Sequence, residues 1–473
     1  MKRLSALDGV TLHAETGTMP THAGGILLLE PHAEGVTMTA DELLQLLGER
    51  LQGTPSFRKR LVAKPFGLGQ PVWADDPKFD VWSHLHRQTL PGPGSRRELA
   101  QLIGRLHDRR QDRSRPLWDA WVIDGFADGR LGVLILLSHA MTDGVGGITS
   151  ILPQLMTTDP DAELPPLVHH PAGKMPNPVD LLGDMVVELT GNGVTTAKVA
   201  LKATPTLLTG AARAALQPVR KLLSGGPPHL DSAMSQQASD DSPRTALNKP
   251  ITRRRSIAFA TVSMDDLRSI AATHDVTIND IFLTAVTTSV RRWLEVHDTV
   301  PTAPLRTLMP INTRAGDDEA SNSFSIGLVK LPVQVADPVE QLKSIHAATH
   351  RLKGARKSAP AVDMGDVLKV VPPVIIEGFA NLYTWQKLSR FHTPLAHMVT
   401  SNIPGPAGEV YLAGAHVSGM FAVPPLFEGA NLNITATSHG KVFDISVISC
   451  PDNIKDVESM AGGLEEAVRE LRG

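Results

Sequence analysis

The order of apolar and polar residues predicts strands and helices in alternation through both halves of the chain. Short apolar runs are typical of buried strands, whereas apolar residues at i, i+3, i+4 and i+7 indicate one buried face of a helix. On this basis strands are expected at 24–29, 121–123, 134–137, 256–262 and across much of 398–450, and helices at 97–108 and 278–293. The sequence therefore predicts a mixed α/β fold.

The stretch from 157 to 250 differs in composition, since it is rich in Pro, Gly, Ser and Ala. Helical patterns occur at 179–189 and 195–216, and a polar stretch follows at 227–250. A chain of 473 residues exceeds what one hydrophobic core usually serves. We therefore expect two α/β domains that meet across a cleft, at 1–156 and 251–473, with residues 157–250 as a partly helical connector.

The most informative segment follows the strand predicted at 134–137. There Ser138 and His139 end the apolar run, and Thr142-Asp143-Gly144 predicts a turn leading into a helix. An imidazole at the end of a strand can face a cleft, and its pKa lets it take a proton from a hydroxyl and return it. Of the 18 histidines, only His139 has an aspartate four residues later. Taken alone, this short pattern fits a structural histidine about as well as a catalytic one.

Charge and cysteine content exclude some classes of protein. The net charge of −3, with both signs interspersed, gives no sign of nucleic-acid binding, and the cluster 253–255 is too short to change this. The single cysteine, Cys450, excludes an internal disulfide and fits a reducing compartment. It lies in an alternating strand-like run, which predicts a structural thiol rather than a nucleophile. Since no apolar segment is long enough to span a membrane, we expect a cytoplasmic protein with at most a peripheral hold on a membrane.

Three other patterns do not complete a site. His169-His170 is an adjacent pair, but no Asp-Gly follows it. The glycines of 144–147 lack the G-x-G-x-x-G spacing of a dinucleotide site. His84 and His86 share a strand face, yet no further Cys, His or Glu completes a set of metal ligands around them. We therefore expect neither a metal nor a dinucleotide cofactor.

Several motifs occur along the chain in a fixed order. They are Leu7-Asp8, Glu15, Thr21-His22-Ala23-Gly24, Phe79-Asp80, His84, Leu90-Pro91-Gly92-Pro93-Gly94, Arg115-Pro116-Leu117-Trp118-Asp119, Ile278-Asn279-Asp280, Pro310-Ile311-Asn312-Thr313-Arg314 and Ser401-Asn402-Ile403-Pro404-Gly405-Pro406. Together with His139 and Asp143-Gly144, they resemble the bacterial wax ester synthase/diacylglycerol acyltransferase family, whose active-site motif is H-H-x-x-x-D-G. The resemblance runs nearly from end to end. It implies two chloramphenicol-acetyltransferase-like α/β domains of the CoA-dependent acyltransferase superfamily.

The same resemblance implies an O-acyltransferase. A long-chain acyl group would move from acyl-CoA to a diacylglycerol, giving triacylglycerol, or to a long-chain alcohol, giving a wax ester. His139 would be the general base, and acyl-CoA a co-substrate, with no further cofactor and no metal. Asp143 would anchor its loop through Arg314, and Gly144 would leave room for the substrate. One position departs from the family, because Ser138 stands where the first histidine of the motif is expected.

The roles of the remaining motif residues are less specific. Asn279 falls in the first turn of a predicted helix, where its amide could cap the helix or polarise a substrate carbonyl. Asp280 is expected to interact with the helix dipole, and Asn402 to lie in a Pro/Gly loop between strands. The residues 116–118 are expected to pack around the cleft rather than take part in the chemistry.

An apolar segment at 367–376, with Phe379 and Leu382, could line an acyl channel or lie on a membrane or lipid-droplet surface. An ordinary core helix interrupted by Pro372 and Pro373 is the commoner structure for such a pattern. Two alternatives to a lipid acyltransferase also stay open. Ser138 fits a catalytically quiet homologue that binds acyl-CoA or lipid, and the wider superfamily includes transfer to non-lipid acceptors.

Overall fold

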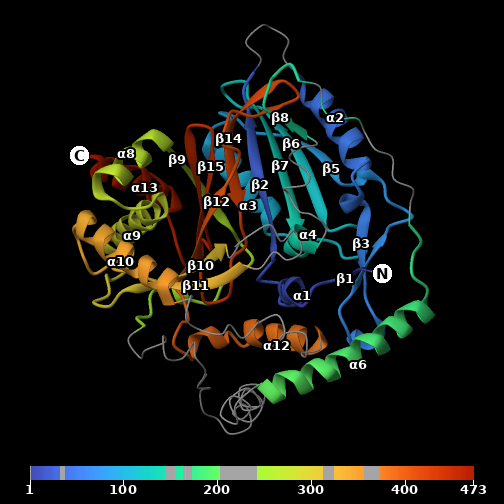
Figure 1. Ribbon diagram of the computed structural model, residues 1–473. Helices are drawn as coiled ribbons and strands as arrows, with labels where there is room; N and C mark the ends of the chain where they lie inside the picture. Colours follow the sequence, from blue (N-terminus) through green and yellow to red (C-terminus); the bar gives the residue numbers. More distant parts are fainter. Residues whose placement is uncertain are drawn as a thin grey trace.

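The computed structural model describes residues 2–31, 38–144, 155–162, 164, 166, 173–202, 242–312, 324–355 and 373–473. Figure 1 shows two large β-sheets side by side, with helices on their outer faces and two further helices, α6 and α12, along one end of the molecule. Strands and helices alternate in both halves, as the sequence predicts.

The described strands of the first large sheet run in the order β5-β6-β7-β2-β14-β13-β8. They are β2 (His22–Leu29), β5 (Leu85–Thr89), β6 (Trp118–Asp124), β7 (Leu131–Ser138), β8 (Met156–Thr157), β13 (Tyr411–Leu412) and β14 (Ala415–Val423). Strand β2 pairs antiparallel with β7 on one side and with β14 on the other. The sheet of the first half is therefore completed by two strands from the C-terminal part of the chain.

The described strands of the second sheet run in the order β11-β10-β12-β15-β16-β9. They are β9 (Ser256–Ser263), β10 (Leu305–Asn312), β11 (Phe324–Leu331), β12 (Met398–Pro404), β15 (Leu432–His439) and β16 (Val442–Ser449). The helices associated with this half are α8 (Met264–His274), α9 (Ile278–His297), α10 (Pro338–Ala355) and α13 (Val457–Arg472). Helix α9 packs against α13 and α10, and its apolar residues belong to the core beneath them.

The first half also contains a small sheet, ordered β1-β4-β3, and several helices. The strands of this sheet are β1 (Lys2–Arg3), β3 (Lys59–Val62) and β4 (Val72–Asp75). The helices are α1 (Ala6–His13), α2 (Ala40–Gln52), α3 (Arg96–His107), α4 (His139–Gly144), α6 (Pro178–Lys202) and, from the second half, α12 (Pro373–Trp385). Short 3₁₀ helices are η1 (Pro55–Arg58), η2 (Pro65–Gly67), η3 (Val81–Ser83), η4 (Ala246–Asn248) and η5 (Leu388–Arg390).

The helices begin where the sequence supplies capping residues. At α3, the Ser95 hydroxyl and the Glu98 carboxylate satisfy each other's backbone N–H groups, and Thr277 with Asp280 does the same at α9. Such reciprocal caps satisfy N–H groups that have no partner within the helix. They place the helices predicted at 97–108 and 278–293 within a few residues of the observed boundaries.

One apolar core joins the two halves. It contains Leu99 and Ile103 of α3, Ile26 of β2, and Ile257 of β9, all buried. Helix α3 thus lies between the first sheet and the second half, and it contacts β9 directly. Cys450 is buried in the same core, where its sulfur accepts the Thr252 N–H at 3.4 Å. The prediction of a structural thiol is confirmed.

The connector contains one long helix where two helical patterns were noted. Helix α6 covers the pattern at 179–189 and continues through part of that at 195–216. Residues 203–241 and His169-His170 lie outside the described part of the chain. The division into 1–156, 157–250 and 251–473 stays a prediction.

Candidate active site

The segment predicted to carry the chemistry lies where β7 ends and α4 begins. Ser138 is the last residue of β7, and His139 is the first residue of α4. The Ser138 N–H donates to the Leu117 carbonyl at 2.8 Å, and its hydroxyl accepts the Ala140 N–H at 3.3 Å. This hydroxyl therefore occupies the capping position of α4. The half-buried His139 is held at the end of a paired strand, as the sequence predicts.

The turn predicted at 142–144 is wrong, because these residues belong to α4. The apolar run passes directly into a helix capped by Ser138, so no turn separates the strand from the helix. The side chains of Asp143 and Gly144 lie outside what the structure describes, as does Arg314. The pairing of Asp143 with Arg314 therefore stays a prediction.

The motif 116–118 forms part of the wall behind this junction. Pro116, Leu117 and Trp118 are all buried, which confirms their predicted packing role. The Trp118 indole donates to the Phe57 carbonyl at 2.8 Å, and its ring stacks on His84 with a centroid separation of 4.5 Å. Since Leu117 also accepts the Ser138 N–H, this motif fixes the end of β7.

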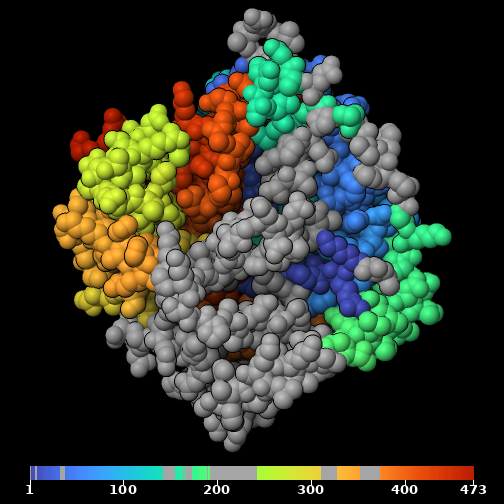
Figure 2. Space-filling view, viewed as in Figure 1, coloured from blue at the N-terminus to red at the C-terminus, as the bar shows by residue number. Residues whose placement is uncertain are grey.

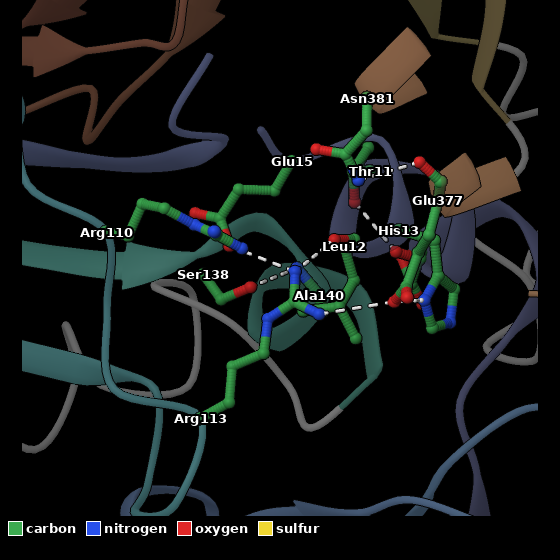
Figure 3. A network of polar contacts seen from close by, with 11 residues as sticks. Thr11, Leu12, His13, Glu15, Arg110, Arg113, Ser138, Ala140, Glu377 and Asn381 are labelled. Atoms are coloured by element: carbon green, nitrogen blue, oxygen red, sulfur yellow. Dashed lines mark hydrogen bonds and ion pairs between the residues drawn. The ribbon is translucent and has the colours of Figure 1, made fainter. Parts of the chain in front are cut away.

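On one side of α4 lies a polar network that we call the Arg113 clasp, formed by His13, Glu15, Arg110, Arg113 and Glu377 (Figure 3). Arg113 donates to the Leu12 carbonyl at 2.6 Å and to Glu15 at 3.0 Å, and lies 3.4 Å from Glu377. Arg110 reaches Glu15 at 3.5 Å. Helix α1 packs against both α4 and α12. The clasp thus connects α12 to α1, and α1 in turn contacts α4, the helix that begins with His139.

His13 is the buried member of the clasp. Its Nδ1 lies 2.7 Å from a Glu377 carboxylate oxygen. Burial lowers the pKa of His13, an effect that the neighbouring Glu377 carboxylate opposes without reversing. The Arg113 guanidinium acts in the same direction as burial. The clasp therefore combines a buried imidazole with a carboxylate that Arg113 also contacts.

Two buried histidines, His22 and His107, lie near Ser138. His22 of β2 pairs directly with Ser138 in the strand register, and its ring lies 4.5 Å from that of His107 in α3. The His107 ring nitrogen Nε2 donates to the His22 carbonyl at 3.2 Å. Burial, with a smaller effect from Arg255, lowers the pKa of His22 to about 4, and burial also lowers the pKa of His107. Both rings are therefore neutral near pH 7.

Asn279 lies in the first turn of α9, but it does not cap the helix. Thr277 fills that position, and the Asn279 amide instead contacts the Met309 sulfur at 3.6 Å. The capping alternative is therefore wrong, and substrate polarisation by Asn279 stays a prediction.

The carboxylate of Asp280 is buried beneath α10. It accepts a hydrogen bond from Thr349 at 2.7 Å and lies 2.9 Å from His346 Nδ1. Burial acts to raise the pKa of Asp280, but the hydrogen bonds from His346, Thr349 and Thr277 outweigh it and the pKa is lowered. Asp280 thus joins α9 to α10, in addition to its place at the helix start.

The sequence predicted Asn402 in a loop, and this prediction is wrong. Asn402 lies within β12, opposite Ala436 of β15. The strand continues through Pro404, and the chain bends only at 407–408, so the Pro/Gly signal begins inside the strand rather than after it. The half-buried Asn402 side chain therefore has the fixed direction of a strand residue. Its contact with substrate stays a prediction.

The prediction for the apolar segment at 367–376, with Phe379, also changes. Its described part begins α12 at Pro373, and Val374, Ile375 and Phe379 are 48%, 57% and 49% exposed. A core helix is therefore the wrong interpretation for these positions. Residues 367–372 lie outside the described part.

Sequence reasoning missed two groups of residues near the junction, the Arg113 clasp and the pair His22 and His107. Glu15 and His22 belong to the motifs that carry the family resemblance, but the motifs do not indicate what these residues contact. His107, Arg113 and Glu377 carry no local signal, because their partners lie far away in the sequence. Only the tertiary structure brings each of these residues to its partner.

Comparison with protein families gives two matches that cover most of the chain. The model described as the wax ester synthase/diacylglycerol acyltransferase catalytic domain matches residues 4–282. The model described as the WS/DGAT C-terminal domain matches residues 320–472.

Curated relatives extend over the whole chain. One relative is the protein MT1809 of Mycobacterium tuberculosis strain CDC 1551, which is named as a proposed diacylglycerol O-acyltransferase. It is 30% identical over 100% of this chain and 90% of its own length. The tgs1 protein of strain H37Rv, whose name proposes the same activity, is 29% identical over 100% of this chain and 96% of its own length.

Two solved structures share the fold. The wax ester synthase/diacylglycerol acyltransferase from Marinobacter aquaeolei VT8 aligns with a TM-score of 0.69 and 24% identity, over 99% of this chain and 98% of that one. The first condensation domain of the calcium-dependent antibiotic synthetase aligns with a TM-score of 0.53 and 11% identity, over 99% and 95% of the two chains. These likenesses confirm the expected fold of two chloramphenicol-acetyltransferase-like domains.

Proposed function

Since this chain belongs to the wax ester synthase/diacylglycerol acyltransferase family, we propose that it transfers a long-chain acyl group from acyl-CoA to the hydroxyl of a diacylglycerol or a long-chain alcohol. Family membership confirms the resemblance and the acyltransferase class that the motifs predicted. The choice of acceptor, the acyl chain length and the role of each site residue belong to the proposal.

In this proposal His139 is the general base. Its imidazole removes the proton from the acceptor hydroxyl as the oxygen attacks the thioester carbonyl. The tetrahedral intermediate collapses, the carbon–sulfur bond breaks, and the imidazolium returns the proton to the CoA thiolate. A thioester is already activated, so acyl-CoA is the only co-substrate that this scheme needs. Asn279 and Asn402 are the proposed donors toward substrate carbonyl groups.

One observation carries the proposal: the motif histidine stands at the junction between a paired strand and a capped helix. The Leu117 carbonyl fixes Ser138 through its backbone, and the Ser138 hydroxyl caps α4. Such an arrangement supports catalysis because it holds the base on regular elements rather than on a loose loop.

Two alternatives have specific support. Ser138 in place of the family's first histidine favours a catalytically quiet homologue that binds acyl-CoA or lipid. The shared fold with a condensation domain favours transfer to a non-lipid alcohol or amine. CoA release with different acceptors distinguishes these alternatives from lipid acyl transfer. A catalytically quiet homologue would release no CoA with any acceptor, and a non-lipid acyltransferase would release CoA only with a non-lipid acceptor.

The test measures free CoA released from palmitoyl-CoA with diacylglycerol, with a long-chain alcohol, with a small amino acid ester, and with no acceptor. We expect release with a lipid acceptor, and a loss of about two to four orders of magnitude in His139→Ala if the imidazole is the base. His350→Ala, at an exposed histidine of α10, is the matched control and should retain activity. Near-normal turnover in a folded His139→Ala enzyme would overturn the assignment of the base.

The proposed substrates are found in membranes and lipid droplets, so the proposal includes a peripheral hold on such a surface. No helix in the described part of the chain is both long and apolar enough to cross a bilayer. The exposed apolar residues of α12 support contact with lipid, either at a surface or at the entrance of a channel.

A further inference from the structure

Helix α6 exposes most of the large apolar residues of its described part and turns two carboxylates inward, although Leu181 is buried and Asp180 is exposed. Val179, Leu182, Val186 and Val187 are between 43% and 75% exposed. The carboxylates of Asp184 and Glu188 lie on the opposite, inward side, where their side chains are 14% and 9% exposed. An amphipathic helix on a globular protein normally buries its apolar stripe. The outward stripe of α6 therefore calls for a partner.

The inward side of α6 is fixed by buried charges, so its orientation is well determined. The Lys64 ammonium, with no exposed area, pairs with Asp184 at 2.6 Å and also with Glu188. Arg3 contacts Asp184 at 2.8 Å, and the Gln70 N–H donates to Glu188 at 3.0 Å. Rotating α6 to bury its valines would leave the buried Lys64 without its partners, which is strongly unfavourable.

The loop that carries Lys64 exposes two more large apolar side chains, Phe66 and Leu68. Phe66 has a left-handed backbone, with φ of 60°, and its side chain is 83% exposed. A bulky residue seldom adopts this conformation, because it brings Cβ close to the backbone. The structure thus presents a phenylalanine to solvent from a backbone conformation that favours glycine.

The same loop bridges the two helices at this end of the molecule. A Cβ added to Gly67 would lie 3.5 Å from Val374 of α12, and one added to Gly69 would lie 2.8 Å from Glu188 of α6. We use the term apolar face for the exposed apolar side chains that these three elements carry at this end of the molecule: Phe66, Leu68, Val179, Leu182, Val186, Val187, Val374, Ile375 and Phe379. Figure 1 shows α6 and α12 at the same end of the molecule, and Figure 2 shows the green atoms of α6 on the surface at the lower right.

We propose that the apolar face docks on a phospholipid bilayer. Anionic head groups repel carboxylates, and the ion pairs with Lys64 and Arg3 keep Asp184 and Glu188 away from the outward side. Cations and an exposed tryptophan follow at the end of α12, where Trp385 is 76% exposed and Lys387 and Arg390 are exposed. An apolar stripe flanked by basic and aromatic residues is typical of helices that lie in a membrane interface.

The docked face would lie close to the candidate active site. Helix α12 contacts α1, which in turn packs on α4 and its His139. Lipid substrates leaving the bilayer would meet this end of the molecule first. The inference rests on the proposed transfer between lipid substrates, although the binding test below does not depend on that transfer.

The test is sedimentation of the full chain with vesicles of phosphatidylcholine and phosphatidylglycerol. We expect Val186→Asp to lower the partition constant about tenfold or more, because a carboxylate would enter the interface. Phe66→Asn, which suits a left-handed backbone, should weaken binding without straining the loop. Val296→Asp is the matched control, since Val296 is 77% exposed on α9, away from the apolar face.

Circular dichroism and CoA release from a short-chain acyl-CoA with a water-soluble alcohol establish that each variant is folded and active. Equal vesicle binding by wild type, Val186→Asp and Phe66→Asn would overturn the inference. So would a wild-type dimer, detected by sedimentation velocity, that Val186→Asp dissociates, because the face would then bind a second copy. If the wild-type chain binds vesicles through this face but releases no CoA, the proposed function is contradicted and the docking inference is not.

Discussion

At the residue scale, Ser138 combines two roles behind His139. Its hydroxyl caps α4, which typically stabilises a helix by about 1 kcal/mol, and its backbone pairs with His22. Since burial keeps His22 and His107 neutral near pH 7, neither ring adds a positive charge beside Ser138, although the buried cation Arg255 acts on both rings. Serine at position 138 likewise adds no charge, whereas the family's histidine would add a third titratable ring.

The neutral state of His22 predicts a loss of stability in acid. Its pKa of about 4 in the folded chain lies below the ordinary value of 6.5, so the unfolded chain binds the proton first as the pH falls. This group should lower the free energy of unfolding by about 2 kcal/mol between pH 7 and pH 5. Urea denaturation at both pH values should show a smaller difference in His22→Phe than in wild type. An unchanged difference would contradict the assigned protonation state.

At the element scale, the sequence predicted those helices and strands whose apolar residues are buried. The strand at 134–137 was predicted from its run of apolar residues, which are mostly buried. The helix at 278–293 was predicted because its apolar residues recur on one buried face. The position of His139 at a strand end followed from the same pattern. Apolar stripes are normally assigned to the core, so the exposed side of α6 was not predicted, and exposure of the α12 segment was only the less common alternative.

The attachment of α12 depends on the Arg113 clasp. Only Pro373 of this helix is buried, while Glu377 contacts both His13 and Arg113. Glu377→Ala should therefore loosen α12, and hydrogen exchange at 373–385 should become roughly three times faster or more. Glu340→Ala, which removes the exposed pair with Lys343 on α10, is the control. Unchanged exchange in Glu377→Ala would show that other contacts hold the helix.

At the scale of the whole molecule, the first sheet depends on a strand from the far end of the sequence. Strand β14 pairs with β2 from Gly24 to Leu29. Local patterns predicted both strands but could not predict this pairing, because it is set by tertiary contacts between distant segments. The first half of the chain therefore does not contain all of its own sheet.

A fragment of residues 1–250 should consequently fail to fold alone. Without β14, the apolar strand β2 would form an open sheet edge, and open edges of this kind promote aggregation. Co-expression with residues 251–473 should restore soluble material that contains both pieces. Purification and a urea unfolding curve provide the measurement, and a soluble fragment that unfolds cooperatively on its own would contradict the prediction.

The same strand crossing affects how the chain folds during synthesis. The ribosome releases β2 and β7 early, whereas β14 emerges only near the end of translation. Until then, the side of β2 that later pairs with β14 is open to other nascent chains, and Ile26 to Leu29 make it apolar. The nascent protein therefore has an aggregation-prone period that lasts for most of its translation, and chaperones that bind apolar strands would protect it during that time.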